Sequence, residues 1–166
     1  MPQGQTKADL VHNLKEAIRS EKITGSFYKY IAEHVENGYI KKTFNRFAQE
    51  EATKHKDLLQ ERLTGLTGET YEPDLTKMDV PLKENGFSLS SAAKAAKESE
   101  VSAIEFYKLA RDQDDPEYKQ MYDDIIKDEK QHSLYLQQDK LFEEEKQLFK
   151  DSLGVKLFAL FTAGSA

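Results

Sequence analysis

The chain has 166 residues, of which 38% are hydrophobic and 33% are charged, and its net charge is −6. This length fits one domain, and the negative charge argues against a nucleic-acid partner. No stretch reaches the roughly 20 apolar residues of a transmembrane segment, and the first residues lack the layout of a secretory signal. The absence of cysteine excludes disulfides, thiolate catalysis and cysteine-ligated metal sites. We therefore expect a cytoplasmic protein with no nucleic-acid partner and no transmembrane segment.

Two helices are predicted in the first part of the chain. Apolar residues recur every three or four positions over residues 10–35 and again over residues 40–58, which is the period of an amphipathic helix. Between these stretches, Asn37 and Gly38 are expected to end the first helix. The second helix is expected to end near Gly65.

Two more helices are predicted in the second part. The same period occurs over residues 89–110 and over residues 118–136. Asp115 followed by Pro116 is typical of a helix start, with the acid as N-cap and proline at the first helical position.

The residues between these helices indicate the topology. Residues 65–88 contain Pro73 and Pro81 and are expected to form one long connection between two antiparallel helix pairs. We therefore predict an all-α four-helix bundle over residues 1–148. An apolar segment within residues 149–166 predicts a short fifth helix, which docks on the bundle or across a dimer interface. Attachment to a membrane surface or to a larger partner is a less favoured alternative for this segment.

Each apolar stripe is interrupted near its middle by ionisable side chains. These are Glu21 in the first stretch, Glu51 and His55 in the second, Glu100 in the third, and Glu129 and His132 in the fourth. Burying an unpaired carboxylate costs several kcal/mol, and no lysine or arginine lies on these stripes in the same layer. Two divalent cations would neutralise the four carboxylates, and two neutral imidazoles would add nitrogen ligands. The sequence therefore predicts a dinuclear metal site, and this mixture of ligands suits iron or manganese.

The spacing of the predicted ligands shows an internal duplication with one irregularity. The separation between Glu51 and Glu129 is one residue longer than the separation between His55 and His132. Within each half, the glutamate and the histidine can share a helix face, because residues three or four apart are neighbours on a helix. We predict a one-residue π-type insertion between Glu51 and His55. The alternative is an ordinary helix that uses the four-residue spacing, and backbone hydrogen bonding across residues 48–56 separates the two.

Other polar residues beside the predicted ligands have simpler interpretations. Tyr28 and Tyr107 follow their glutamates by seven residues and so share the same face, where they serve as core residues or as hydrogen-bond donors to the ligands. Glu50, Glu98 and Glu105 are turned away from the stripes and are expected to be solvated.

Four stretches of the sequence resemble the rubrerythrin-type ferritin-like domain over about residues 8–140: SEKITGSFY, FAQEEATKH, ESEVSAIEFYKLA and IIKDEKQH. The resemblance implies a ferritin-like bundle with a non-haem di-iron site whose ligands are the six residues above, with Tyr28 and Tyr107 donating to the ligand carboxylates. Two features depart from the family. The chain has no cysteines for a rubredoxin-like iron site, and Ala103 occupies the position of an additional glutamate. An external electron donor is therefore expected.

These observations predict a di-iron oxidoreductase that reacts with peroxide or dioxygen, with Glu51 and Glu129 as bridging ligands. Manganese or a mixed metal pair is the alternative to two iron ions, and a homodimer is the expected oligomer. A second hypothesis is an iron-binding or ferroxidase protein for storage or delivery, without steady-state turnover. A third is a scaffold that binds no metal.

Overall fold

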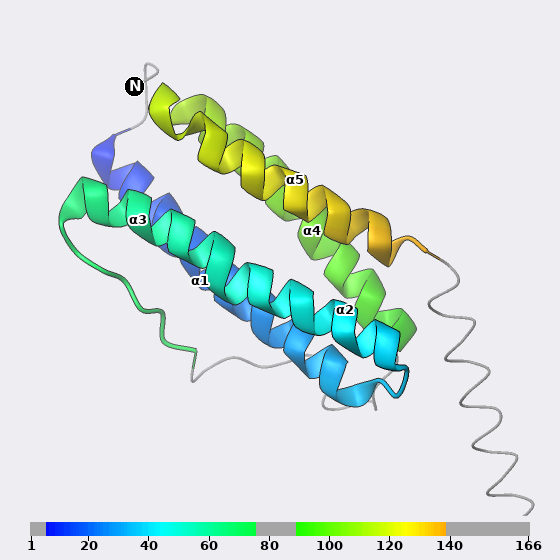
Figure 1. Ribbon diagram of the computed structural model, residues 1–166. Helices are drawn as coiled ribbons and strands as arrows, with labels where there is room; N and C mark the ends of the chain where they lie inside the picture. Colours follow the sequence, from blue (N-terminus) through cyan, green and yellow to red (C-terminus); the bar gives the residue numbers. More distant parts are fainter. Residues whose placement is uncertain (1–5, 76–88, 139–166) are drawn as a thin grey trace, which may run out of the picture.

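The computed structural model describes residues 6–75 and 89–138, and within these ranges it contains helices and no strand (Figure 1). The α-helices are α1 (Lys7–His34), α2 (Gly38–Gln49), α3 (Lys56–Thr67), α4 (Leu89–Gln113) and α5 (Lys119–Leu136), and they are joined by the π-helix η1 (Glu50–His55) and the 3-10 helix η2 (Pro116–Tyr118). Because α2, η1 and α3 follow one another without a break, the described residues form four long helices. The predicted all-α four-helix bundle is confirmed.

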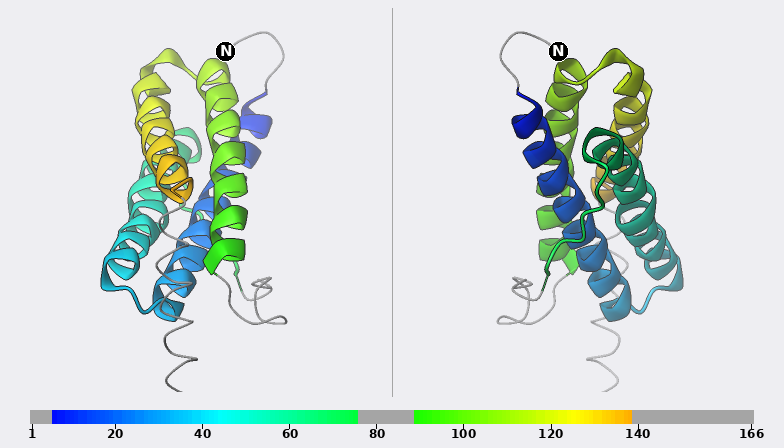
Figure 2. Two further views of the ribbon diagram at one scale, coloured as in Figure 1. Left: turned by 90° about the vertical axis from the view of Figure 1, so that its right-hand side faces the viewer. Right: turned by 90° about the vertical axis from the view of Figure 1, so that its left-hand side faces the viewer.

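The four long helices form two antiparallel hairpins that pack against each other (Figure 2). The first hairpin, residues 7–67, consists of α1 and the continuous helix from α2 to α3. The second hairpin, residues 89–136, consists of α4, η2 and α5.

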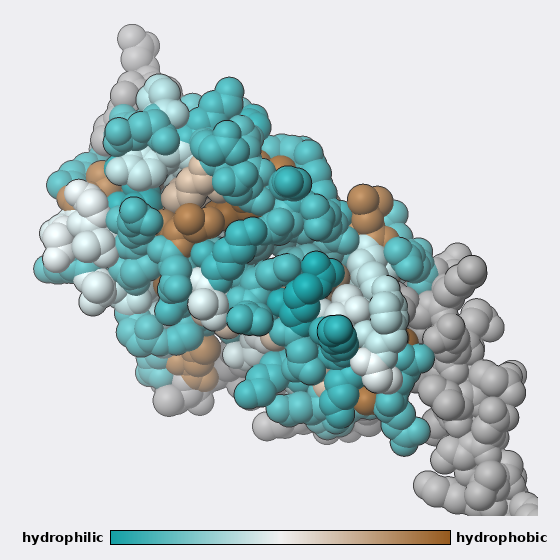
Figure 3. Space-filling view, viewed as in Figure 1, coloured by the Kyte–Doolittle hydropathy of each residue, from teal (hydrophilic) through white to brown (hydrophobic). Residues whose placement is uncertain are grey.

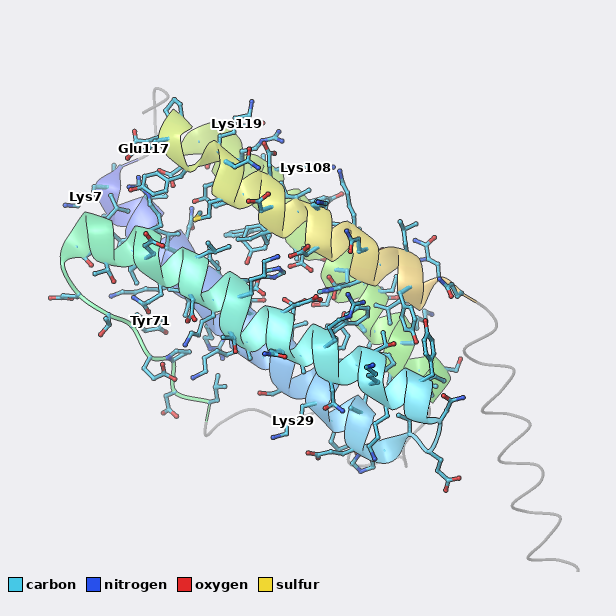
Figure 4. All side chains as sticks on the ribbon, viewed as in Figure 1. Lys7, Lys29, Tyr71, Lys108, Glu117 and Lys119 are labelled. Atoms are coloured by element: carbon cyan, nitrogen blue, oxygen red, sulfur yellow. The ribbon has the colours of Figure 1, made fainter. Side chains whose placement is uncertain are left out.

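The described part of the connection between the hairpins lies against the first hairpin. The backbone N–H of Tyr71 donates a hydrogen bond of 3.1 Å to the side-chain oxygen of Gln60 in α3. The Lys15 ammonium of α1 lies 5.5 Å from the centre of the Tyr71 ring. Figure 4 labels Tyr71 beside the first hairpin. These contacts hold the chain along the bundle after α3, as the predicted crossover requires.

The observed helix ends correct one prediction. Asn37 does not end α1 but begins α2, because its side-chain oxygen accepts hydrogen bonds from the backbone N–H groups of Tyr39 (2.9 Å) and Ile40 (3.1 Å). The second long helix ends at Thr67, near Gly65 as predicted, and Gly68 adopts the left-handed conformation (φ 75°) that caps a helix C-terminus. The predicted start at Asp115 and Pro116 is confirmed, and it first forms the short helix η2.

The buried apolar side chains form two clusters along the bundle. One cluster contains Tyr28, Ile31, Ala32, Val35, Ile40, Phe44, Phe47, Ala48, Leu89, Ala92, Ala93, Ala96 and Leu136. The other contains Leu10, Leu14, Ala17, Ile18, Leu59, Leu63, Tyr107, Tyr122, Ile125 and Ile126. Along each long helix, the buried acids and histidines come between the residues of one cluster and those of the other.

Two predictions lie beyond what the described residues can test. The predicted fifth helix within residues 149–166 falls outside these ranges, and so does the segment 76–88 of the connection. Among the described helices, none has the length and apolar character needed to cross a bilayer.

Candidate metal centre

The structure brings the six predicted ligand residues together. Each is almost completely buried, and Glu21, with 3% exposure, is the most accessible of them. Their side chains form two overlapping groups whose candidate ligand atoms lie within 4.8 Å of one another. One group is Glu21, Glu51, His55 and Glu129, and the other is Glu51, Glu100, Glu129 and His132. Oxygen and nitrogen atoms accordingly gather between the helices halfway along the bundle (Figure 4).

His55 directs its Nδ1 atom at the first group. This nitrogen lies 3.1 Å from Glu51 Oε2, 3.3 Å from Glu21 Oε2 and 3.5 Å from Glu129 Oε1. Three carboxylates from three helices therefore surround one imidazole nitrogen.

His132 directs the equivalent atom at the second group. Its Nδ1 lies 2.8 Å from Glu51 Oε1 and 3.7 Å from oxygens of both Glu100 and Glu129. Glu51 and Glu129 thus present one oxygen to each histidine, which is the arrangement expected of two carboxylates shared between two neighbouring ions.

The outer nitrogens of both histidines contact acids that were not predicted to belong to the site. His55 Nε2 lies 3.2 Å from Asp128 Oδ2, and His132 Nε2 lies 2.7 Å from Glu50 Oε2. Glu50 was expected to be solvated, but its side chain is only 25% exposed and faces His132. A carboxylate on the outer nitrogen fixes the orientation of a ligating imidazole, so Asp128 and Glu50 belong to the site as supporting residues.

Two buried tyrosines each donate a hydrogen bond to a glutamate of the other hairpin. The Tyr28 hydroxyl donates a hydrogen bond to Glu100 Oε1, and the Tyr107 hydroxyl donates to Glu21 Oε1. Each tyrosine therefore holds the glutamate of the other hairpin rather than the one that precedes it in its own helix. Glu98 and Glu105 are exposed, as expected.

The predicted π-type insertion is confirmed, since residues 50–55 form the π-helix η1. Gly25 of α1 lies against this helix, and a Cβ atom added there would lie 2.8 Å from Ala52 Cβ in the bulge and 3.0 Å from the Ala48 carbonyl oxygen in α2. Only glycine fits at this position without movement of the neighbouring helix. The bulge also changes the phase of α3, in which Leu59 is fully buried and Leu58, the predicted stripe residue, is only partly buried.

The four carboxyl groups of the cluster fall into two kinds, two with a raised pKa and two with a lowered pKa. Burial, together with the neighbouring Glu129, raises the pKa of Glu100 to about 9, and burial beside Glu51 raises the pKa of Glu21 well above its usual value. Burial also acts on Glu51 and Glu129, but hydrogen bonds from the partner glutamate and the histidines outweigh it and lower both pKa values. In each pair, these shifts favour the protonated form of one carboxyl group and the ionised form of the other.

Both histidines are held in the protonated form by the same carboxylates. Burial opposes the imidazolium charge, but Glu129, Glu21 and Glu51 raise the pKa of His55, and Glu100 and Glu129 lead the same effect on the pKa of His132. Without metal, the raised pKa values favour the protonated forms of Glu21, Glu100, His55 and His132 and so reduce the negative charge of the cluster.

The residues present fit a dinuclear metal centre. In the described chain, Glu51 Oε1, Glu100 Oε2 and His132 Nδ1 are buried and have no hydrogen bond of acceptable geometry. Buried polar atoms without partners are rare in folded proteins, and here all three belong to candidate ligands. Four carboxylates and two imidazoles form a donor set that suits iron or manganese.

A groove approaches the centre from the surface between α3 and α5. It has a volume of about 330 Å³, and Asp128, which contacts His55, forms part of its lining together with Lys54 and Leu58. Lys54 pairs with Asp128 at 2.5 Å. The face seen in Figure 3 is mainly hydrophilic, with a small hydrophobic area in the trough between these two helices.

The fold and the buried carboxylate–histidine cluster define a ferritin-like bundle with a candidate dinuclear metal centre. The family model described as Rubrerythrin matches residues 12–140, and the chain belongs to the rubrerythrin family. Among solved structures it is similar to a Rhodobacter capsulatus bacterioferritin that was described with a metal-free dinuclear site and heme iron. That similarity has 25% sequence identity and a TM-score of 0.63, and it covers 95% of each chain. No curated protein matches the chain.

Proposed function

We propose that the chain is a non-haem di-iron oxidoreductase that reduces peroxide or dioxygen. The observation that carries this proposal is the pair of shared carboxylates, Glu51 and Glu129, which belong to both four-residue groups of the cluster. In the proposed assignment these two glutamates would contribute to holding both ions. Glu21 and His55 complete the set at one ion, and Glu100 and His132 complete it at the other.

The charge balance supports two divalent ions. Four ionised glutamates carry −4, two ferrous ions carry +4, and neutral histidines leave this sum unchanged. Manganese or a mixed pair satisfies the same balance and is the alternative to iron. A bound di-iron pair would supply the electrons and the Lewis acidity that reduce an O–O bond.

The surrounding side chains would orient and protect this chemistry. Tyr28 and Tyr107 hold the two terminal glutamates through their hydroxyl protons, and Asp128 and Glu50 hold the two imidazoles. The two apolar clusters exclude water from both ends of the centre. The groove beside Asp128 would admit a molecule as small as peroxide.

Sustained turnover needs electrons from outside the chain. The sequence has no cysteine with which to build its own rubredoxin-like iron site, so we propose an external one-electron donor. A homodimer and a cytoplasmic location complete the proposal.

Metal analysis followed by peroxide assays tests this function. We expect about two iron ions per chain after anaerobic reconstitution, and steady-state peroxide consumption when a reductase and an electron carrier are supplied. Glu129→Gln should abolish both, whereas Glu105→Gln, at an exposed position of α4, should change neither. Less than one metal ion per chain after reconstitution with iron or manganese would contradict the proposal.

The second candidate is an iron-binding or ferroxidase protein for storage or delivery, and the similarity to a bacterioferritin favours it. This function predicts a single stoichiometric burst of iron oxidation with no steady-state consumption of peroxide. The same assay, with and without the electron donor, separates the two candidates.

A further inference from the structure

The two tyrosines of the centre have different neighbours. Tyr28 packs on Phe44 and Phe47, with ring centres 5.6 and 5.5 Å apart. Tyr107 packs on Tyr122, with ring centres 6.4 Å apart. Phe44 and Tyr122 occupy equivalent positions of the two hairpins, because each lies seven positions before the shared glutamate of its own hairpin. Only the second hairpin therefore places an oxidisable ring at this position.

Tyr122 is also joined to a polar network that extends away from the centre. Its hydroxyl donates a hydrogen bond of 2.9 Å to Asp114 Oδ2, although both residues are buried. Arg62 donates to the same carboxylate from Nε at 3.0 Å and from Nη2 at 2.5 Å. The Arg62 guanidinium lies 3.7 Å from the centre of the Tyr118 ring, which is partly exposed. The network thus connects the ring beside Tyr107 to the surface at the end of the bundle.

A phenol that loses an electron becomes a strong acid, so a tyrosine in a protein interior needs a proton acceptor within hydrogen-bond distance if it is to be oxidised and then reduced again. Asp114 supplies this acceptor for Tyr122, even though it is paired with Arg62. From the ring contact with Tyr107, the hydrogen bond to Asp114 and the route to Tyr118, we infer that Tyr122 is a one-electron relay between the protein surface and the metal centre.

The proposed step balances as follows, and it takes its oxidant from the proposed function. Reduction of peroxide to two waters consumes two electrons and two protons. Peroxide, the oxidant of the proposed function, would take one electron from the Tyr107 ring, while the phenolic proton of Tyr107 is held at Glu21 Oε1. Tyr122 then gives an electron to Tyr107, which recovers its proton, and the phenolic proton of Tyr122 passes to Asp114 Oδ2.

An external one-electron donor restores Tyr122, and Asp114 returns the proton. A second passage delivers the second electron, and solvent supplies the two protons that form water. Tyr107, Tyr122, Glu21 and Asp114 all end in their starting states.

A purely structural role would explain the same contacts. Arg62 in α3 and Asp114 at the end of α4 join the two hairpins, and Tyr122 could serve only to complete the hydrogen bonding of the buried carboxylate. A radical localised on Tyr122 is a property that this structural role does not predict.

Photo-oxidation of the metal-free full chain tests the relay without any contribution from iron. The sequence has no cysteine, so Gly65→Cys provides a unique site for a ruthenium polypyridyl photo-oxidant. Gly65 is exposed, and a Cβ atom at this position would lie 3.7 Å from the Tyr118 hydroxyl, which is ordinary contact. A flash in the presence of persulfate as electron acceptor then withdraws an electron next to Tyr118.

We expect a long-lived tyrosyl radical in the electron paramagnetic resonance spectrum, and slower formation of this radical in D₂O because the proton moves to Asp114. Tyr122→Phe in the labelled chain should abolish the long-lived signal. Tyr135→Phe is the matched control, because Tyr135 packs on Phe47 in the other apolar cluster, and it should leave the signal unchanged.

Incorporation of 3-fluorotyrosine at position 122 provides a second measurement that keeps the hydroxyl and the fold. The fluorine hyperfine splitting should then appear in the radical spectrum. An unchanged signal in Tyr122→Phe, or a spectrum without fluorine splitting, would overturn the inference. Because no metal is present, either result would leave the proposed reaction at the metal centre standing.

Discussion

The two hairpins supply the same chemistry through different local structures. Each contributes one terminal glutamate, one shared glutamate, one histidine and one tyrosine to the cluster, together with an acid that contacts the outer nitrogen of the histidine from the other hairpin. The first hairpin, however, contains the π-helix η1, whereas α5 runs through Glu129 and His132 as an ordinary α-helix.

This difference teaches that the position of a ligand atom can be kept while the chain length between ligands changes. The π-helix accommodates one additional residue between Glu51 and His55, and both histidines still present Nδ1 to the cluster. The accommodation requires Gly25 on the facing helix, four positions after Glu21. The equivalent position of the second hairpin, four positions after Glu100, is Ile104.

The largest expected effect is the pH dependence of metal binding, which tests whether the two hairpins hold equal numbers of protons. Because the pKa values of Glu21, Glu100, His55 and His132 are raised, we expect all four groups to carry a proton without metal. Binding of two divalent ions should therefore release about four protons and weaken about 10⁴-fold for each unit by which the pH is lowered. Calorimetric titration in buffers of different ionisation enthalpy measures this release.

Glu21→Gln and Glu100→Gln provide the comparison between the hairpins, since each removes one titrating group. Both variants should release about three protons if the hairpins are equivalent. A release near zero in the unsubstituted protein would contradict the assigned protonation states.

The next effect distinguishes a glutamate shared by both groups of the cluster from an acid that only supports a histidine. Glu51→Gln should weaken binding of both metal ions by more than about 100-fold, because this carboxylate belongs to both groups. Glu50→Gln alters only the support of His132 and should cost about 10-fold to 100-fold. Competition titrations with a coloured chelator measure both affinities, and equal losses in the two variants would refute the shared role of Glu51.

A third prediction concerns the stability of the metal-free protein. The pKa of Glu100 is about 9 in the folded protein and about 4.5 in the unfolded chain, so burial of this carboxyl group costs about 3 kcal/mol at pH 7. Glu100→Gln should raise the free energy of unfolding by about this amount at pH 7. The gain should vanish below pH 4.5, where the carboxyl group is protonated in both states.

Urea denaturation at several pH values measures this gain, and Glu105→Gln on the exposed side of α4 is the control. With metal bound, the sign should reverse, because Glu100→Gln removes a ligand. Destabilisation of the metal-free protein by Glu100→Gln would show that the carboxyl group is not under the strain that its pKa indicates.

The smallest effect tests the reason for the π-helix and its glycine. Gly25→Ala should destabilise the protein by about 1–3 kcal/mol, because the added methyl group meets Ala52. Deletion of Ala52 should convert η1 into an ordinary helix with the spacing of the second hairpin. In that background, Gly25→Ala should cost less, because the contact with Ala52 is lost while the 3.0 Å contact with the Ala48 carbonyl oxygen remains.

Gly65→Ala is the matched control for this pair, because an added Cβ atom at Gly65 finds space and should stabilise both backgrounds alike. Thermal or urea denaturation measures the four combinations. If Gly25→Ala costs the same with and without Ala52, the bulge is not what requires the glycine.

The helical period was sufficient to predict the bundle and to predict that the six cluster residues lie at the same height along it. It works for these positions because Leu, Ile, Phe and Tyr fix the phase of each helix independently of the acids. It failed for Leu58, since the π-helix shifts the phase by one residue and buries Leu59 instead.

The supporting acids were missed for a different reason. Glu50 and Asp128 lie beside the stripe on their own helices, and they reach the cluster only because a histidine from the other hairpin turns its outer nitrogen toward them. A period within one helix carries no information about that partner. The duplication did contain a signal, because an acid directly precedes the shared glutamate in both halves. Asn37 was assigned to the wrong helix because asparagine can cap either end.

The exchange of side chains between the hairpins has a consequence for assembly. Each four-residue group takes ligands from both hairpins, and each tyrosine holds a glutamate across the boundary. Half of the chain would therefore offer an incomplete cage, whereas two halves together make a whole one. A protein severed between Thr67 and Leu89 would have a complete cage only when its two fragments pair through the apolar clusters, and bound metal would strengthen that pairing.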